Sequence, residues 1–504
     1  MIQGHATGES TWNWAHRYPT MAHTALGRSG LTCSRVGFGG YRIDTQTAIH
    51  REALRLALGS GINLIDTSAN YADGRSEKLV GQVLAELIDE GALVRETVIV
   101  VTKAGYLQGQ NYELSRNRKQ EGRPFPDLIP YAEGLEHCIH PEFLEDQITR
   151  SLERLNLACI DVLLLHNPEY FLSWAAKEGT ALETARQIYC KRIQLAFGHL
   201  EKEVARGRIR CYGISSNTFP DAPGQADFTS LTEVQACAEA LKPDHHLAVI
   251  QFPMNLFENG AMLEANQPDG RTLLAAARRL GLGTLVNRPL NALTANGLIR
   301  LADVPAGPAL PPEEVADRLQ DLVTSEARFV REILPNLGLA PETASQISRQ
   351  LTMAEALRTH HDAYSSYDHW RQIESEHILP RAGGVLAYLQ QNAGNPTTRG
   401  WMSDYGTCLK RALEAVRSCY APAAAQRATA LKAAIRKADT DWDTDNTLSQ
   451  LAIRTLVSTP GISAVLVGMR QPAYVRDVLA ALQPIPEDRE RTASWAKLKA
   501  DLPA

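Results

Sequence analysis

Four polar side chains with complementary acid–base properties lie at or just beyond the ends of three consecutive apolar runs: Asp66, Tyr71, Lys103 and His166. A tyrosine phenol, with an ordinary pKa of about 10, donates a proton poorly at neutral pH unless a neighbouring ammonium group stabilises the phenolate. Lys103 would stabilise Tyr71 in this way, and Asp66 would hold Lys103 charged. His166 would hydrogen-bond a substrate oxygen or relay the proton. Each residue alone has a structural alternative, such as a turn cap or a solvated charge, but together the four predict a proton-donating oxyanion site.

The elements that must position these side chains follow a regular rhythm. Apolar runs rich in Val, Ile and Leu recur, and each is followed by an amphipathic helical pattern, which predicts βα units of a parallel sheet. The runs are residues 34–37, 63–66, 98–103, 161–166, 210–214, 248–251, 283–287 and 464–468. Eight such units predict an α/β fold, a (β/α)8 TIM barrel whose strand ends converge at one face. An open doubly wound sheet is disfavoured, because the glycines at 37–40 lack GxGxxG spacing and are not followed by a helix.

The seventh and eighth runs are separated by far more chain than one helix requires. Residues 301–445 carry long helical patterns and predict a mainly helical insertion between strands seven and eight, which would open on the catalytic face. We therefore expect an N-terminal arm at 1–24, a barrel at 25–300 plus 446–482, the insertion at 301–445 and a C-terminal tail at 483–504.

Charge and composition exclude several classes of protein. The 52 Lys and Arg residues against 57 Asp and Glu give a net charge of −5, which does not suggest a nucleic-acid partner. No apolar stretch is long enough for a membrane helix or resembles a signal peptide, so we expect a cytoplasmic protein. The eight cysteines include no CxxC pair and indicate free thiols. The insertion places Glu374 and His377 at i, i+3 spacing, but the second copy that a di-iron bundle needs is missing, so we expect no metal.

Six motifs carry a family resemblance. They are GFGGYRI, GINLIDTSANYADGRSE, VTKAG, IDVLLLHNP, YGISSN and VIQFPMN, in this order. Through them the chain resembles the aldo-keto reductase superfamily over about residues 25–300 and 446–482. The resemblance implies hydride transfer from a nicotinamide cofactor to an aldehyde, ketone or sugar carbonyl, or the reverse oxidation, with Tyr71 as the acid.

The resemblance also implies a set of cofactor contacts, which fall in four groups. They are Gly39, Gly40 and Tyr41 after the first strand; Ser215, Ser216, Asn217 and Gln251 around the nicotinamide carboxamide; Asn287, Arg288, Pro289 and Leu290 after strand seven; and Gly468, Met469, Arg470, Tyr474 and Asp477 after strand eight. Ser216 stands where the family has Asn, and Asn287 where it usually has a Tyr that stacks on the nicotinamide ring. Arg288 is placed to bind the pyrophosphate and Arg470 a 2′-phosphate, which favours NADPH, with NADH as the alternative.

Two functions from different classes remain. The first is an enzyme that acts on a small-molecule carbonyl or sugar. The second is a nicotinamide-binding scaffold or redox sensor whose helical insertion binds a partner protein. The intact set of four catalytic residues favours the enzyme, since a scaffold would not need it. The sequence also leaves room for a homo-oligomer.

Overall fold

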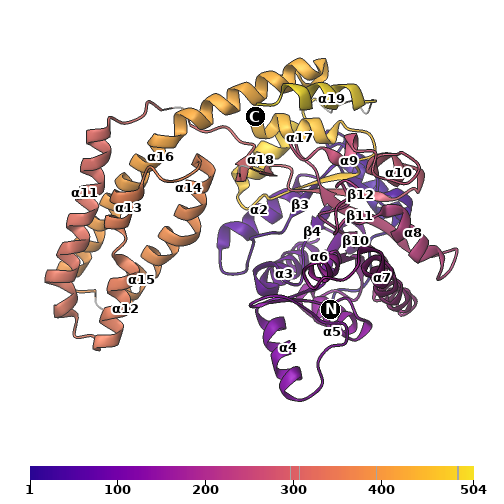
Figure 1. Cartoon of the computed structure of the whole chain (residues 1–504), viewed down its shortest axis with the longest axis horizontal. Coiled ribbons are helices and arrows are strands. Elements are labelled where there is room, and N and C mark those ends of the chain that lie inside the picture. Colours follow the sequence, from indigo (N-terminus) through magenta and orange to yellow (C-terminus); the bar gives the residue numbers. More distant parts are fainter. Residues whose placement is uncertain (296, 306, 393, 485–486, 488, 504) are drawn as a thin grey trace. The chain divides into compact units, whose positions relative to one another are not determined.

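The structure is a computed structural model of the 504-residue chain and describes residues 1–295, 297–305, 307–392, 394–484, 487 and 489–503. The chain forms two compact units (Figure 1). The first comprises Met1–Ala292 and Ala434–Leu502, and the second contains Leu293–Ala433. None of the helices in the described ranges combines the length and apolar character that a bilayer crossing requires.

Eight parallel strands of the first unit close into a barrel. In chain order they are β3 (Val36–Gly39), β4 (Leu64–Asp66), β5 (Ile99–Ala104), β9 (Ile160–His166), β10 (Ile209–Ser215), β11 (Leu247–Pro253), β12 (Gly283–Asn287) and β15 (Ala464–Val467). The last strand closes the ring, because β15 pairs with β12 at Ala464 and with β3 at Val465. The predicted TIM barrel is confirmed, and each observed strand overlaps the apolar run that predicted it.

Helices cover the outside of the barrel because each has one apolar face. They are α2 (Ala48–Gly59), α3 (Arg75–Asp89), α5 (Pro141–Leu155), α7 (Leu182–Ala205), α8 (Leu231–Glu239), α10 (Leu273–Arg279), α17 (Leu448–Val457) and α18 (Pro472–Ala481). In α3, for example, Leu79, Val83 and Leu87 are buried, whereas Lys78 and Gln82 face solvent. This spacing of three to four residues is the pattern that a helix needs to pack on a sheet.

The N-terminal arm packs on the barrel at the amino-terminal ends of its strands. Helix α1 (Gly8–Arg17) is fixed by Trp14, whose indole N–H donates to the Gly61 carbonyl at 3.0 Å. Strands β1 (His23–Ala25) and β2 (Thr32–Ser34) form a two-stranded antiparallel sheet. Leu26 and Leu31 join the same apolar cluster as the barrel residue Val162. The arm therefore closes the end of the barrel opposite the strand ends that carry the polar residues.

The connection after β5 is enlarged at the carboxyl-terminal end of the strands. It contains β6 (Tyr106–Leu107), α4 (Gln110–Gln120), β7 (Ile129–Ala132) and β8 (Leu135–His137). The three short strands form a sheet in the order β6-β8-β7. The chain after the third barrel strand thus forms a folded insertion with a small sheet of its own.

The second unit is mainly helical and has its own apolar core. Its elements include the short strands β13 (Asn291–Thr294) and β14 (Gly297–Arg300) and the helices α11 (Pro312–Arg328), α12 (Pro341–Leu351), α13 (Ala354–His360), α14 (Tyr367–Ile373), α15 (Leu379–Asn392) and α16 (Pro396–Ala438). Trp370, Trp401 and Leu319 lie in the core, nearly or fully buried. Glu374 is also buried and is ion-paired with Arg371 and Arg417. These ion pairs explain the burial of Glu374. The opening of this unit on the catalytic face stays a prediction.

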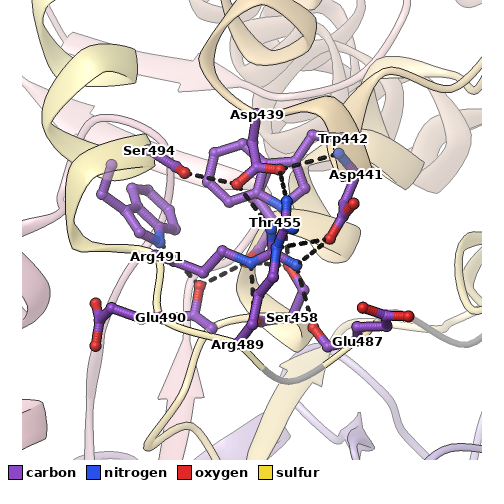
Figure 2. A network of polar contacts seen from close by, with 12 residues as sticks. Asp439, Asp441, Trp442, Thr455, Ser458, Glu487, Arg489, Glu490, Arg491 and Ser494 are labelled. Atoms are coloured by element: carbon purple, nitrogen blue, oxygen red, sulfur yellow. Dashed lines mark hydrogen bonds and ion pairs between the residues drawn. The ribbon is translucent and has the colours of Figure 1, made fainter.

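A buried ionic cluster lies where α16 returns to the barrel unit. It surrounds Arg491, just before α19 (Thr492–Asp501), and involves the short turn η7 (Thr440–Trp442) (Figure 2). The fully buried Arg491 guanidinium donates to Asp439 Oδ2 and to Asp441 Oδ2, both at 2.7 Å. Burial acts to raise the pKa of Asp439, but hydrogen bonds from Ser494, the Asp441 backbone N–H and Arg491 outweigh it and lower that pKa to about 2. The cluster ties the C-terminal segment to the chain that leads into α17.

Candidate active site

The barrel brings Asp66, Lys103 and Tyr71 together at the carboxyl ends of neighbouring strands. Asp66 ends β4, Lys103 lies near the end of β5, and Tyr71 opens the short 3-10 turn η2 (Tyr71–Gly74) that follows β4. The Lys103 ammonium donates to Asp66 Oδ2 at 2.7 Å, to the Thr67 carbonyl at 2.9 Å and to the Tyr71 hydroxyl oxygen at 3.3 Å. Its three N–H groups are thus all used. The Tyr71 oxygen accepts a hydrogen bond here and keeps its own proton to donate.

Burial and the neighbouring groups together set the protonation of Lys103 and Tyr71. Lys103 is fully buried, which disfavours its charge, but Asp66 and then Tyr71 outweigh burial and raise the Lys103 pKa above its ordinary value. Burial also raises the pKa of Tyr71; Lys103 opposes this rise, and Asp66 adds to it. Lys103 thus lowers the Tyr71 pKa as the sequence predicts, but burial outweighs it, and the net shift is upward. Tyr71 is therefore a neutral phenol that can act as an acid. The Lys103 ammonium group beside it would stabilise the phenolate that proton donation leaves.

His166 stands beside this trio as a neutral imidazole. Burial is the main cause that holds the His166 pKa well below its ordinary value, and Lys103 and then His137 act in the same direction. Its Nδ1 lies 3.1 Å from the Ser68 hydroxyl, which donates to Asn70 Oδ1 at 2.7 Å. The ring packs edge-on to Tyr71, with centroids 6.1 Å apart. Contacts through Nδ1 therefore orient the ring and leave Nε2 for a ligand.

Gln251 connects this group to the residues expected around a nicotinamide. Its amide donates to Asp66 Oδ1 at 2.8 Å, and its carbonyl accepts from the Ser215 hydroxyl at 3.0 Å and from the Asn287 amide at 3.5 Å. Parallel pairing produces this arrangement, since Ser215 is level with Gln251 on the neighbouring strand and also with His166. Asn287 Oδ1 is buried and has no partner among the described residues. This unpartnered acceptor and the amides around it suit a primary carboxamide.

The two residues after Ser215 are placed differently from each other. Ser216 is fully buried, and its hydroxyl contacts Thr218 and Thr229 at 3.2 and 3.1 Å, so it does not face the other predicted carboxamide residues. The Asn217 side-chain amide makes no hydrogen bond within the described part of the chain, whereas its backbone N–H donates to Glu169 Oε1 at 2.8 Å. Asn217 is thus the better candidate to replace the Asn of the family.

Glu169 is a positioning residue that sequence reasoning missed. Its carboxylate accepts from the Asn167 amide at 3.0 Å and from the Asn217 N–H, and it therefore joins the loops after β9 and β10. Burial raises the pKa of Glu169 to about 7. In the sequence, only its position three residues after His166 could have indicated this positioning role.

The three residues after the first barrel strand that were expected to contact the cofactor differ in role: two are required by the packing of the barrel, and one can contact a ligand. Gly39 and Gly40 are required by the barrel itself, because a Cβ at Gly40 would lie 2.8 Å from the Asp66 carbonyl oxygen and one at Gly39 3.0 Å from that of Val467. Tyr41 is 59% exposed and packs edge-on to Tyr71 with centroids 5.2 Å apart. Of the three, only Tyr41 offers a side chain to a ligand.

Only some of the residues that were expected to bind the cofactor after strands seven and eight have side chains available to do so. Arg288 is ion-paired with Glu258, Pro289 is buried and Leu290 is half-buried.

After β15, Met469 is fully buried, and the Asp477 carboxylate accepts from Ser449 and Gln450, both at 2.8 Å. Gly468 and Tyr474 are exposed. Arg470 makes no hydrogen bond or ion pair with any residue that the structure describes, so its guanidinium is available to an anion.

A cavity of about 460 Å³ opens beside Tyr71. Its lining is mixed, with the aromatic rings of Tyr41 and Tyr71 and several hydrogen-bonding groups. The lining residues are Tyr41, Arg42, Asp44, Asn70, Tyr71, Ala72 and Gln108. Sequence reasoning missed Arg42, Asp44, Asn70 and Gln108, although each follows a barrel strand within a few residues. The space suits a small polar molecule whose reacting atom reaches the Tyr71 hydroxyl.

Fold and site define a closed (β/α)8 barrel that carries an Asp–Lys–Tyr array at the carboxyl ends of its strands. The chain belongs to the aldo/keto reductase family, whose model matches residues 35–366.

Curated relatives include the aldo-keto reductase YhdN of Bacillus subtilis, 28% identical over 246 residues that cover 47% of this chain and 55% of that protein. The NAD(P)H-dependent D-xylose reductase of Scheffersomyces stipitis is 28% identical over 204 residues, or 38% and 51% of the two chains. The chain thus spans about half the length of the curated relatives it matches. Among solved structures, the holo form of aldo-keto reductase AKR11C1 from Bacillus halodurans aligns over 95% of this chain and 96% of its own, with 17% identity and a TM-score of 0.45.

Proposed function

We propose that this protein reduces the carbonyl group of a small polar aldehyde, ketone or sugar with NADPH, and that Tyr71 donates the proton. The observation that carries the proposal is the buried contact of Lys103 with both Asp66 and Tyr71, at 2.7 and 3.3 Å. A phenol that accepts from an ammonium group and keeps its own hydrogen free is arranged to protonate an oxygen in front of it.

The chain's residues would act in sequence on the substrate oxygen. The Tyr71 hydroxyl would donate to this oxygen. His166 would donate to it from Nε2 in the tautomer that carries the proton there, with the Ser68 hydroxyl donating to Nδ1 instead of to Asn70. As negative charge develops on the carbonyl oxygen, Tyr71 transfers its proton to that oxygen, and the charge left on the phenolate is balanced by Lys103. Asp66 holds Lys103 in place through a contact that does not change during the reaction. Because Asp66, Lys103 and His166 are buried and Tyr71 is partly buried, their interactions are stronger than in water.

NADPH supplies the hydride when bound. Ser215, Asn217, Gln251 and Asn287 would hold the carboxamide of its nicotinamide ring and thereby fix which ring face meets the substrate. Arg470 would bind the 2′-phosphate, which favours NADPH over NADH. Since Arg288 is paired with Glu258, a contact to the pyrophosphate would require it to leave that partner.

The cavity lining favours a substrate that carries hydroxyl groups. Asp44, Asn70 and Gln108 provide acceptors and donors, and the Tyr41 ring provides an apolar face against which a sugar ring would pack. The same residues would serve the reverse oxidation, whose extent is set by the cofactor ratio.

Two measurements test the proposed function. Tryptophan fluorescence should be quenched saturably by NADPH and more weakly by NADH. A screen of aldehydes, ketones and aldoses should then find at least one compound that causes NADPH consumption. Saturable binding without turnover on any compound would refute the reductase and leave the scaffold as the better account.

A further inference from the structure

Two cysteines that take no part in the candidate active site, Cys190 of α7 and Cys237 of α8, lie next to each other. The Cys237 thiol donates to the backbone carbonyl oxygen of Cys190 over 3.6 Å, which places its sulfur beside Cys190. Cys237 is only 3% exposed, whereas Cys190 is half-buried and can be reached from solvent. An accessible thiol therefore lies directly beside a hidden one.

Cys190 also differs chemically from the other cysteines. All eight lie within the described residues, and Cys190 alone has a thiol pKa below its ordinary value. The hydrogen bond from Cys237 is the main cause of this lowering, which burial, Glu233 and Glu183 oppose. By contrast, burial raises the thiol pKa of Cys33 and Cys211 to about 12. Because the thiolate is the reactive form, Cys190 is the cysteine most ready to attack a disulfide.

We propose that Cys190 and Cys237 form a reversible disulfide that links α7 to α8, made by exchange with a low-molecular-weight disulfide such as glutathione disulfide. The Cys190 thiolate first attacks one sulfur of the small disulfide, whose S–S bond breaks and releases one thiolate. Cys237 then loses its proton to water and attacks the Cys190 sulfur, which expels the second thiolate. Two cysteine thiols are oxidised, and one disulfide is reduced to two thiols.

The position of the pair places this link near the candidate cofactor site. Tyr189, the residue before Cys190, contacts the Thr229 hydroxyl at 3.1 Å through its own hydroxyl. Thr229 in turn accepts from the Ser216 hydroxyl at 3.1 Å. The disulfide would therefore join the two helices beside the hydrogen bonds that hold the loop after β10.

A peptide map tests the proposal directly. The full-length protein is incubated with glutathione disulfide in the native state, its remaining thiols are alkylated after denaturation, and it is digested with trypsin without reduction. We expect peptide 187–191, which carries Cys190, to be cross-linked to peptide 211–271 and released by reduction. Peptide 211–271 contains both Cys211 and Cys237, so two variants assign the partner. The cross-link should persist in Cys211→Ser and disappear in Cys237→Ser.

The second variant also tests the order of attack. In Cys237→Ser, Cys190 should keep one glutathione as a stable mixed disulfide, because no neighbouring thiol can displace it, whereas the unmodified protein should keep none. Circular dichroism checks that each variant is folded. Alkylation of both Cys190 and Cys237 after treatment of the unmodified protein, a lasting glutathione on its Cys190, or a cross-link that survives in Cys237→Ser would overturn the proposal.

Discussion

Replacing Lys103 with Met should slow proton donation strongly, because it removes the charge that faces the Tyr71 oxygen at 3.3 Å. Met nearly matches the lysine in length and leaves the side chain apolar. With an effective dielectric constant of about 20, a unit charge at this separation is worth about 5 kcal/mol to the phenolate, which corresponds to roughly 10³-fold or more in rate. In the variant the Asp66 carboxylate has lost its partner. If Asp66 becomes protonated, its negative charge no longer opposes the phenolate, and the loss in rate is smaller.

Single-turnover kinetics of the NADPH absorbance, with a substrate found by the activity screen, measure this effect. The rate of the chemical step should fall by about three orders of magnitude, whereas the Kd of NADPH should stay close to that of the unmodified protein, since Lys103 is not among the proposed cofactor contacts. Lys202→Met, which removes an exposed lysine of α7, is the matched control and should leave both values unchanged. A Lys103→Met rate within tenfold of the original, about 1.4 kcal/mol, would refute the charge-stabilisation argument.

Three further predictions concern cofactor choice and stability. Arg470→Met should weaken NADPH binding about tenfold or more and leave NADH binding unchanged in fluorescence titrations, because a charge-assisted contact is worth about 1.5–3 kcal/mol; equal losses for both cofactors would contradict this. Arg491→Met should lower the free energy of unfolding in urea by about 3 kcal/mol, the low end for a broken buried ion pair, since Asp439 and Asp441 lose their buried partner but keep the half-exposed Arg489; an unchanged urea midpoint would argue against that role. The folded-state pKa of Asp439 is lowered to about 2, so the stability that its carboxylate contributes is present above the unfolded pKa of about 4 and is lost as the pH falls towards 2. Asp439→Asn should therefore flatten the pH–stability curve between these two values. A curve unchanged by the substitution would exclude this contribution.

The barrel could be predicted from the sequence because its strands are buried on both faces. Such strands appear as short continuous apolar runs, and the residues at their ends converge wherever the runs pair in parallel. The convergence of Asp66, Lys103 and Tyr71 follows from this rule alone. The pairing of Ser215 with Gln251 also follows from it, since both residues lie near the ends of adjacent strands.

The remaining site features depend on contacts between distant segments, which no local pattern reveals. Arg288 is held by Glu258 from the preceding βα connection, and Asp477 by side chains of α17. Ser216 turns towards Thr229, so that it does not face the other residues proposed to hold the carboxamide. The direction of the Tyr71 pKa shift depends on the balance of burial against one ammonium group, which spacing in the sequence does not determine.

The central claim is that Tyr71 is the proton donor, and Tyr71→Phe tests it most directly because it removes only the hydroxyl group. The variant should bind NADPH with the original Kd and should lose about 10²–10⁴-fold in the single-turnover rate of carbonyl reduction. Tyr18→Phe, at the end of the N-terminal arm, is the matched control and should keep the full rate. Unchanged carbonyl reduction by Tyr71→Phe, with NADPH binding intact, would contradict the account.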